Sequence, residues 1–292
     1  MKSKASGAGH DRSPWDTILF PLSSFAQNVQ GLGIVGRQTM ARRKALIVVP
    51  CLNEEASLPA LLDRFEESLR PLSATHEIDI LVVDDGSVDR TSEVARRRGV
   101  RVARLRRNLG IGGAVQTGLR LAARQGYDCA MQVDGDGQHP PSEIPSLLAA
   151  LDLPDPPDLV IGSRFIGSAR DAEWKTTALR RIGIGWLSFV LRTFVHLDVA
   201  DPTSGFRVYG RRALELFDDN YPYDFPEPES LAIARAAGLK VLEVPVQMQA
   251  RQGGASSIRG FSTAYYMLKV TLAVLLTFAR STSPWRRPKR DL

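Results

Sequence analysis

Short apolar runs rich in β-branched residues recur along the chain, and segments with helical spacing of apolar positions lie between them. The runs with this composition are Ala45–Pro50, Ile78–Val83, Val100–Leu105, Cys129–Val133, Leu159–Gly162 and Lys240–Val246. Continuous apolar runs of this length are typical of strands buried on both faces of a parallel sheet. The pattern therefore predicts an α/β fold with a mostly parallel, Rossmann-like central sheet, whose ligands bind beyond the carboxyl ends of the strands.

Two further apolar segments have helical spacing, Thr177–Leu197 and Tyr265–Phe278. The first contains several arginines, and the second is shorter than the roughly 20 apolar residues that a membrane span needs. Cations follow the second segment, at Arg280, Arg286, Arg287, Lys289 and Arg290. We expect residues 260–292 to form an amphipathic helix at a membrane interface with a basic tail that anionic lipid attracts. A helix buried in the core or in a dimer is the alternative.

Residues 1–43 are rich in Ser, Gly and Gln and lack the continuous apolar core of a secretory signal. We expect a loosely ordered N-terminal extension. Met40 stands directly before a basic triplet and the first predicted strand, so the hypothesis is that either Met1 or Met40 is the true start. N-terminal sequencing of the native protein distinguishes the two.

Charge and cysteine content narrow the class of protein. The formal net charge is +6, but no motif of interleaved aromatic and basic residues accompanies it, so we do not expect a nucleic-acid partner. The two cysteines, Cys51 and Cys129, lie in apolar runs rather than in the spaced pairs of a zinc site or a disulfide framework. They are typical of buried thiols in a reducing compartment.

Two carboxylates spaced two apart follow the run Cys129–Val133. In an extended segment Asp134 and Asp136 point the same way, and Gln138 continues this register with a carbonyl oxygen. Hard oxygen ligands of this kind suit Mg²⁺ or Mn²⁺, and so few protein ligands leave positions for a substrate diphosphate. A plain Asp-Gly turn is the alternative.

Other polar residues follow the remaining strands. Asp84 and Asp85 come after the second strand and are candidates for the base or ribose of a nucleotide; a turn with a helix cap is the alternative. The segment Asn108–Gly113 lacks both the third glycine of a dinucleotide loop and the lysine of a P-loop. It is interpreted as a tight turn that lets backbone approach a nucleotide. Arg164 follows a later strand, and its planar guanidinium suits phosphate.

Two segments near the end of the chain add polar groups. Glu227 and Glu229 stand at the start of a predicted helix, where acidic side chains stabilise the positive end of the helix dipole. The glycine-rich, basic segment from Arg251 to Ile258 has the composition of a loop that closes over an anionic substrate.

Together these motifs resemble family 2 glycosyltransferases, and more narrowly the dolichyl- or polyprenyl-phosphate mannose and glucose synthases. The resemblance spans about Lys44 to Leu276. It rests on Val49-Pro50 with Asn53-Glu54, Val83 to Ser87 with Asp89-Arg90-Thr91, Asn108 with Gly110, Asp134 to Gln138, Gly162-Ser163-Arg164, Ser204-Gly205-Phe206-Arg207, and Arg251 with Gly254 and Ser256.

The resemblance implies a GT-A fold, a three-layer sandwich, over residues 44–259. It implies an inverting, metal-dependent transfer of a hexosyl group from a nucleotide sugar of the GDP-mannose or UDP-glucose type to polyprenyl phosphate. Nucleotide-sugar-binding residues would be Pro50, Asn53, Glu54, Asp84, Asp85, Asn108, Gly110, Asp134 and Asp136. Asp134, Asp136 and Gln138 would hold Mg²⁺ or Mn²⁺, and the acceptor phosphate would contact Arg164, Arg180, Arg181, Arg251 and Ser256. Asp136, Arg164 and Arg251 would be catalytic.

The sequence also departs from this pattern. It shows no long pair of C-terminal membrane spans such as some members carry, so we expect a peripheral protein on the cytoplasmic face of the membrane, with an integral-membrane partner as a further expectation. The resemblance assigns no role to Glu227-Pro228-Glu229. One alternative is transfer to a glycan or another hydroxyl acceptor, which requires a carboxylate base such as Glu227 or Glu229. More remote alternatives are a nucleotidyltransferase and a non-catalytic binding module.

Overall fold

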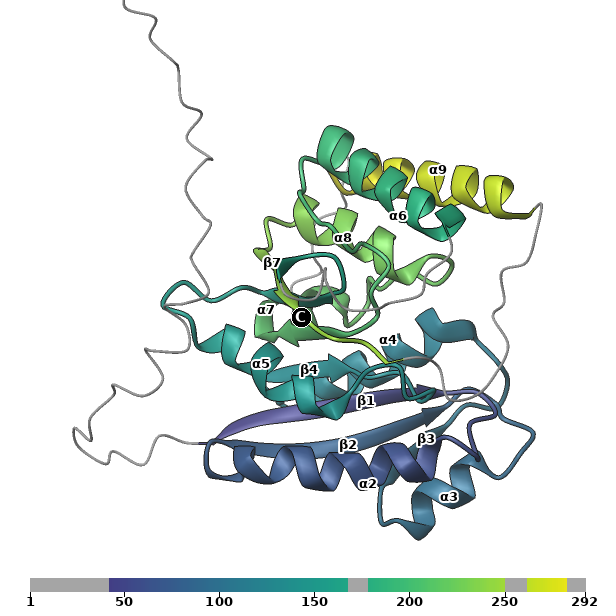
Figure 1. The fold of residues 1–292 in the computed structure, drawn as a ribbon, viewed down its shortest axis with the longest axis vertical. Coiled ribbons are helices and arrows are strands. Elements are labelled where there is room, and N and C mark those ends of the chain that lie inside the picture. The colour runs from purple at the N-terminus through teal and green to yellow at the C-terminus, as the bar shows by residue number, and fades with distance from the viewer. Residues whose placement is uncertain (1–41, 168–177, 250–261, 283–292) are drawn as a thin grey trace, which may run out of the picture. The chain divides into compact units, whose positions relative to one another are not determined.

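The computed structural model describes residues 42–167, 178–249 and 262–282, and the described residues from Arg42 onward belong to one compact unit. A seven-stranded sheet runs through this unit in the order β3-β2-β1-β4-β6-β5-β7 (Figure 1). Its strands are β1 (Arg43–Cys51), β2 (His76–Asp84), β3 (Arg101–Arg104), β4 (Cys129–Gln132), β5 (Leu159–Ser163), β6 (Arg207–Gly210) and β7 (Val241–Pro245). Each apolar run predicted as a strand lies in this sheet, which confirms the predicted α/β fold.

One strand breaks the parallel arrangement. Strand β6 is antiparallel to both of its neighbours, β4 and β5, whereas the other pairs are parallel. The first residue of β6, Arg207, therefore lies opposite Gln132 at the carboxyl end of β4. The loop before β6 consequently reaches the same sheet edge as the loops that follow β1, β2 and β4.

The sheet is covered by helices on both faces. Side chains alternate along β1, so that Leu46 and Val48 point to one face and Ile47 to the other. The first face is covered by α4 (Gly110–Arg124), α7 (Arg211–Phe217) and α8 (Pro226–Ala236). The second face is covered by α2 (Leu58–Leu69), α3 (Thr91–Arg97) and α5 (Ile144–Ala149). Short 3₁₀ turns cover Arg70–Ala74, Pro141–Glu143 and Ala150–Asp152. This is the expected three-layer arrangement.

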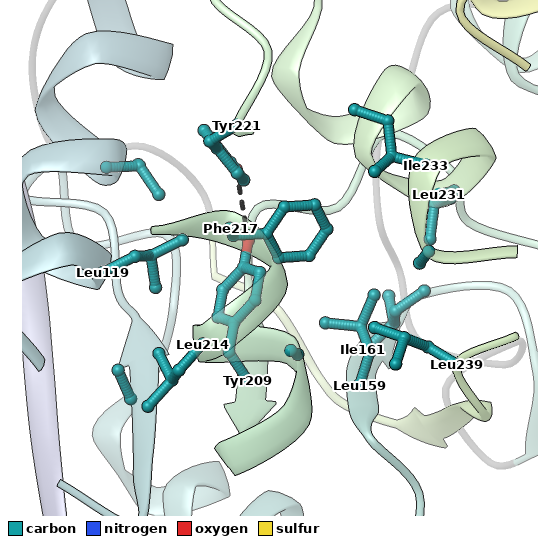
Figure 2. Packing of buried hydrophobic residues seen from close by; sticks show 14 of the residues in the cluster. Leu119, Leu159, Ile161, Tyr209, Leu214, Phe217, Tyr221, Leu231, Ile233 and Leu239 are labelled. Carbon is teal, nitrogen blue, oxygen red and sulfur yellow. Dashed lines mark hydrogen bonds between the residues drawn. The ribbon is translucent and has the colours of Figure 1, made fainter. Parts of the chain in front are cut away.

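An aromatic cluster fills the core behind β6. Tyr209 points toward Tyr221, and their hydroxyl groups share a hydrogen bond of 3.1 Å (Figure 2). Phe217 packs edge-on against both rings, at centroid distances of 5.8 Å from Tyr209 and 5.4 Å from Tyr221. Burial raises the pKa of both tyrosines. The two hydroxyl groups are hydrogen-bonded to each other, so the strand that begins at the site edge rests on a firmly packed core.

The two long apolar segments form helices that differ from the expected ones in length. The segment Thr177–Leu197 becomes α6 (Ala178–Val190), followed by one π-helical turn over Leu191–Val195. The expected helix Tyr265–Phe278 extends at both ends to form α9 (Ser262–Thr282), 21 residues long. None of the helices that the structure describes is both long and apolar enough to cross a bilayer.

Helices α6 and α9 lie side by side above α8 (Figure 1). Trp186 of α6 donates from Nε1 to Thr271 of α9 at 2.9 Å, and Thr277 of α9 donates to Glu229 of α8 at 2.8 Å. Val270 and Val274 of α9 are buried against the core. The helix interpreted as interfacial therefore packs within the same compact unit as the sheet.

Candidate active site

A cavity of about 400 Å³ opens at the carboxyl edge of β1, β2 and β4. Its volume lies within the range of small-molecule sites in proteins. The residues that line it are Pro50, Cys51, Leu52, Glu54, Asp85, Asn108, Gly110, Ile111, Ala114, Asp134, Gly135 and Asp136. Seven of the nine residues predicted to bind a nucleotide sugar are thus brought to one place, and the other two, Asn53 and Asp84, lie beside it.

Asp134 and Asp136 line this cavity from the loop after β4. The Asp136 carboxylate accepts the backbone N–H of Gln138 at 3.0 Å, which turns the loop tightly. A side chain at Gly135 would lie 2.6 Å from Cys51 Sγ, so only glycine lets the loop pack this closely on the end of β1. The predicted aspartate pair therefore sits in a defined turn directly beside the cavity.

These aspartates fit a divalent cation that shares its ligands with a substrate. Both carboxylates face one cavity and supply hard oxygen ligands. Within the described ranges, no group of three or more His, Cys, Asp and Glu side chains forms a metal site by itself. A cation held here would therefore need further oxygen ligands. Gln138, the third predicted ligand, is not among the residues that line the cavity, and its role stays a prediction.

Asp84 and Asp85 are neighbours with different roles. Asp84 is fully buried and accepts hydrogen bonds from the Ser87 N–H, at 2.8 Å, and from the Ser92 hydroxyl group. Burial alone would raise its pKa, but these hydrogen bonds and nearby Arg104 lower it. Asp84 thus organises the loop after β2.

Asp85 faces the cavity instead. Its carboxylate accepts the backbone N–H of Leu109 at 2.7 Å. Burial raises the pKa of Asp85, and the backbone N–H groups of Leu109 and Gly110 offset this only in part. Of the two, Asp85 is the carboxylate placed to accept hydrogen bonds from a ligand.

The loop after β1 is tied to the loop after β2. Asn53 adopts a left-handed backbone conformation with φ of 58°, which asparagine tolerates better than most residues. Its amide oxygen accepts the Val88 N–H at 2.9 Å, and its own N–H donates to Ser87 at 2.9 Å. Glu54 donates its N–H to Thr91 at 2.8 Å and lines the cavity. Asn53 therefore shapes the wall from behind, whereas Glu54 belongs to the wall itself.

The turn at Asn108 behaves as predicted. The Asn108 amide oxygen accepts the Gly110 N–H at 2.7 Å, and Gly110 has a φ of +80°. A side chain at Gly86 would lie 2.9 Å from the backbone at Arg107 and Asn108. Glycine at positions 86 and 110 lets the backbone of this turn approach the cavity.

Arg164 is held in a buried ion pair that sequence analysis did not predict. Its Nε and Nη2 both donate to the Asp201 carboxylate at 2.7 Å, and Nη2 also donates to Thr203. Glu243 in turn accepts the backbone N–H groups of Ala200 and Asp201. Asp201 lies just before the Ser204–Arg207 motif of the family resemblance, but the spacing along the chain did not indicate that Asp201 pairs with Arg164.

The other predicted phosphate contacts are only partly described. Arg181 is exposed on α6. Arg180 belongs to the same helix, but its side chain lies outside the described residues, as do Arg251 and Ser256. Their assignment stays a prediction.

The two glutamates at the start of α8 differ in their contacts. Glu229 accepts the Phe225 N–H at 3.2 Å as well as the Thr277 hydroxyl group, so it caps α8 and binds α9. Burial raises the pKa of Glu227, the nearby Arg207 lowers it in part, and Asp134 raises it further. Of the two glutamates, Glu227 is therefore the one whose pKa is affected by the charge of Asp134.

Comparison with known proteins decides the family. The model for glycosyl transferase family 2 matches residues 46–217, more than half of the chain. The chain belongs to glycosyltransferase family 2. As a member of this family the protein is an enzyme, a glycosyltransferase, which sets aside the nucleotidyltransferase and the non-catalytic binding module.

Two curated relatives of this glycosyltransferase are similar over most of their length. An undecaprenyl-phosphate mannosyltransferase from Micrococcus luteus is 33% identical over 238 residues, which cover 78% of this chain and 93% of the relative. A polyprenol monophosphomannose synthase from Mycolicibacterium smegmatis is 31% identical over 253 residues, which cover 82% and 91%. The family named from sequence motifs is thus confirmed.

Solved structures show the same fold. Glucosyl-3-phosphoglycerate synthase from Mycobacterium tuberculosis, in complex with Mn²⁺, uridine diphosphate and glucosyl-3-phosphoglycerate, superposes with a TM-score of 0.56 at 22% identity. The match covers 83% of this glycosyltransferase and 80% of that chain. This likeness confirms the predicted GT-A fold.

Proposed function

We propose that this glycosyltransferase transfers a hexosyl group, with inversion, from a nucleotide sugar to polyprenyl phosphate. One observation carries the proposal: the protein combines a polar donor cavity with an exposed apolar surface suited to a lipid. The names of the two relatives, which are polyprenyl-phosphate mannosyltransferases, support the same acceptor and favour mannose as the sugar.

The exposed apolar surface consists of eight large side chains on α6, its π-helical turn and α9. They are Ile182, Trp186, Phe189, Phe194, Tyr265, Leu268, Leu272 and Leu276, each between 46% and 69% exposed. The four residues of α9, and Ile182, Trp186 and Phe189 of α6, are spaced by three or four residues, which places those of each helix on one side. Phe194 lies in the π-helical turn that follows α6. Large apolar side chains exposed together on two neighbouring helices are typical of a surface that binds a membrane or a protein. We refer to these eight residues as the apolar face.

Cations accompany the apolar face. Arg181, Lys269 and Arg280 are exposed on the same two helices, and four more basic residues lie in the sequence after Trp285. Each cation near an anionic membrane surface contributes about 1 kcal/mol. We therefore assign the apolar face to the membrane, with the protein bound peripherally on the cytoplasmic side and an integral-membrane protein receiving the product.

Chain topology links this face to the donor cavity. Strands β5 and β7 are parallel neighbours, with Ser163 beside Pro245 at their carboxyl ends. The segment after β5 leads to α6, and the segment after β7 leads to α9. Arg164 and Arg251 belong to these two connections in the sequence. We infer that these two arginines bind the phosphate of a lipid whose tail stays in the bilayer, because a guanidinium group suits phosphate.

The residues divide the chemical work between them. Asp134, Asp136 and Gln138 would hold Mg²⁺ or Mn²⁺, which when bound neutralises the diphosphate leaving group. Asp85, Glu54 and the backbone at Gly110 would bind and orient the nucleotide. A phosphate acceptor is already an anion, so it attacks the anomeric carbon without a general base. The remaining problem is bringing two anions together, which the arginines solve by charge.

A second candidate function is transfer to a hydroxyl acceptor, and one observation favours it. Glu227 lies electrostatically close to Asp134 and has a raised pKa, as a general base requires. The two candidate functions differ in whether they need a general base. A hydroxyl acceptor does not react without the base, whereas a phosphate acceptor does.

Labelled transfer tests the proposal. Purified protein is incubated with Mg²⁺ or Mn²⁺, a short polyprenyl phosphate and each of several radiolabelled nucleotide sugars, and the lipid is extracted into organic solvent. We expect label in the organic phase from one donor, and no label with Asp136→Ala. Labelled product that forms only on a water-soluble glycan would instead support the hydroxyl acceptor.

A further inference from the structure

The segment Ser204–Arg207 has no task in the proposed mechanism, yet the fold brings it to the aspartate loop. Strand β6 runs antiparallel to β4, so Arg207 lies opposite Gln132, two residues before Asp134. The residues just before β6 therefore lie beside the end of β4. Ser204, Gly205 and Phe206 are therefore placed to influence the aspartate loop.

Gly205 leaves room for two side chains of the aspartate loop. An added Cβ would lie 2.8 Å from Gln132 Nε2 and 3.3 Å from Asp134 Oδ2. The contact to the amide is closer than real Cβ atoms allow, so any side chain at this position would displace Gln132 or Asp134. Gly205 is thus a fixed boundary for both groups.

Gln132 orients Asp134 from within the sheet. It is fully buried at the end of β4, and its Nε2 donates to Asp134 Oδ1 at 3.0 Å. A buried amide keeps its hydrogen bond because water cannot replace it. One carboxylate oxygen of Asp134 is therefore fixed in direction.

His139 also contacts Asp134. Its Nδ1 accepts the Asp134 backbone N–H at 2.9 Å, which places the ring hydrogen on Nε2, 3.7 Å from Asp134 Oδ2. The imidazole stacks on Phe206 with a centroid distance of 4.8 Å and an interplanar angle of 7°. Phe206 is fully buried, so the ring has little freedom to turn.

Buried hydrogen bonds anchor this assembly to the sheet. Arg207 is fully buried and donates to the carbonyl groups of Ser204 and Pro202 and to the Ser230 hydroxyl group. Ser204 donates its hydroxyl group to the Gly162 carbonyl at 2.6 Å. The backbone before β6 is thereby tied to both β5 and α8.

We propose that Gln132, His139 and the Gly205-Phe206 pair are positioning residues that hold the Asp134 carboxylate in the orientation needed to bind the divalent cation. The inference rests on the metal site of the proposed function. Groups that orient a metal ligand typically change metal affinity by 10- to 100-fold when removed. The same loss is expected here for each positioning residue.

Binding of Mn²⁺ to the full-length protein tests this directly, because the free ion has an electron paramagnetic resonance signal that bound Mn²⁺ loses. The titration uses Mn²⁺ alone and Mn²⁺ with saturating uridine or guanosine diphosphate. Gln132→Met and His139→Phe remove the hydrogen bonds and keep the volume, and Gly205→Ala intrudes on the boundary. We expect the dissociation constant for Mn²⁺ to rise 10- to 100-fold in each of these three variants. The matched control is Gly185→Ala, since a Cβ there meets nothing within 4 Å.

The outcomes separate this inference from the proposed function. If Asp134→Ala and Asp136→Ala leave Mn²⁺ binding unchanged, the metal site is misplaced and both ideas fail. If those two variants weaken binding but Gln132→Met and His139→Phe stay within twofold of the wild type, the positioning role alone is wrong. A lower thermal midpoint with unchanged Mn²⁺ affinity likewise contradicts it, because that result describes a purely structural role.

Discussion

Asp84 and Asp85 show how adjacent carboxylates acquire different tasks from their surroundings. Asp84 is surrounded by hydrogen-bond donors and a nearby arginine, whereas Asp85 is buried at a cavity with fewer compensating groups. Their pKa values accordingly shift in opposite directions. The first aspartate stabilises the fold when ionised, and the second is held ionised at a cost in stability.

Substitution by asparagine should therefore have opposite effects on stability at the two positions. Asp84→Asn should lower the free energy of unfolding by about 1–3 kcal/mol, because buried donors lose a charged partner. Asp85→Asn should raise the thermal midpoint at pH 7, because it removes a buried charge, and should weaken nucleotide-sugar binding by about tenfold or more. Thermal unfolding and calorimetric titration measure the two effects.

The pH dependence of stability tests whether the pKa values of Asp84 and Asp85 shift in opposite directions. The pKa of Asp84 is lowered in the folded state, so its contribution to stability is present above its ordinary pKa and is lost as pH falls through the lowered one. The pKa of Asp85 is raised, so the stability gained in Asp85→Asn should shrink as pH falls through that raised value. Equal shifts in both variants across this range would contradict the assignment.

Arg164 has to be tested with a conservative change. Arg164→Ala leaves Asp201 buried without its partner and should cost about 3–5 kcal/mol of stability, so its kinetics are hard to interpret. Arg164→Lys keeps the charge but loses the two-point contact. We expect a higher KM for polyprenyl phosphate and an unchanged KM for the nucleotide sugar. Arg212→Lys is the control, since Arg212 pairs with Asp158 away from the cavity; identical kinetics for both variants would refute a role in acceptor binding.

At the scale of elements, α6 and α9 each have two apolar sides. On α9, Val270 and Val274 are buried while Leu268 and Leu272 are exposed. Such helices need an apolar partner on the outer side as well as on the inner one. The same duality explains why hydrophobic spacing alone left a core helix and an interfacial helix as alternatives.

Removing apolar groups from the outer side of α9 should detach the protein from membranes. Burying one leucine side chain contributes about 1.5–3 kcal/mol, so Leu268→Gln with Leu272→Gln should weaken binding to anionic vesicles more than tenfold. Val88→Gln is the control, because Val88 is exposed but lies far along the chain, between β2 and α3. Vesicle sedimentation measures the partitioning. Unchanged partitioning together with a dimer that the double variant dissociates would assign the apolar face to a second copy.

The elements and most of the cavity could be predicted from the sequence because they depend on local patterns. Asp85, Gly110 and Asp134 follow buried strands, and parallel strands bring such positions to one edge. For Asp84 and Asp85 the sequence left nucleotide binding and a turn with a helix cap as alternatives, and it did not show that Asn53 ties two loops together. Spacing does not show which polar group faces a cavity and which joins two loops. The position of Glu229 at the start of α8 was predicted, but its second partner Thr277, like the Asp201 partner of Arg164, comes from a distant segment that only the folded chain brings close.

At the scale of the whole molecule, the protein has a polar cavity at the carboxyl edge of β1, β2 and β4, and an apolar face on α6 and α9, the helices that follow β5 and β7. We propose that one substrate reaches the cavity from water and the other from a bilayer. The acceptor is the central question, because a lipid acceptor uses both the cavity and the apolar face, whereas a soluble acceptor uses only the cavity.

The most direct test compares two acceptors that differ only in the phosphate. Wild-type protein is supplied with its nucleotide sugar and with vesicles that contain either polyprenyl phosphate or the corresponding polyprenol, and labelled lipid is counted. We predict transfer to polyprenyl phosphate, none to polyprenol, and continued transfer to the phosphate by Glu227→Gln, because an anionic acceptor needs no general base. Transfer to polyprenol at a comparable rate, abolished by Glu227→Gln, would contradict it.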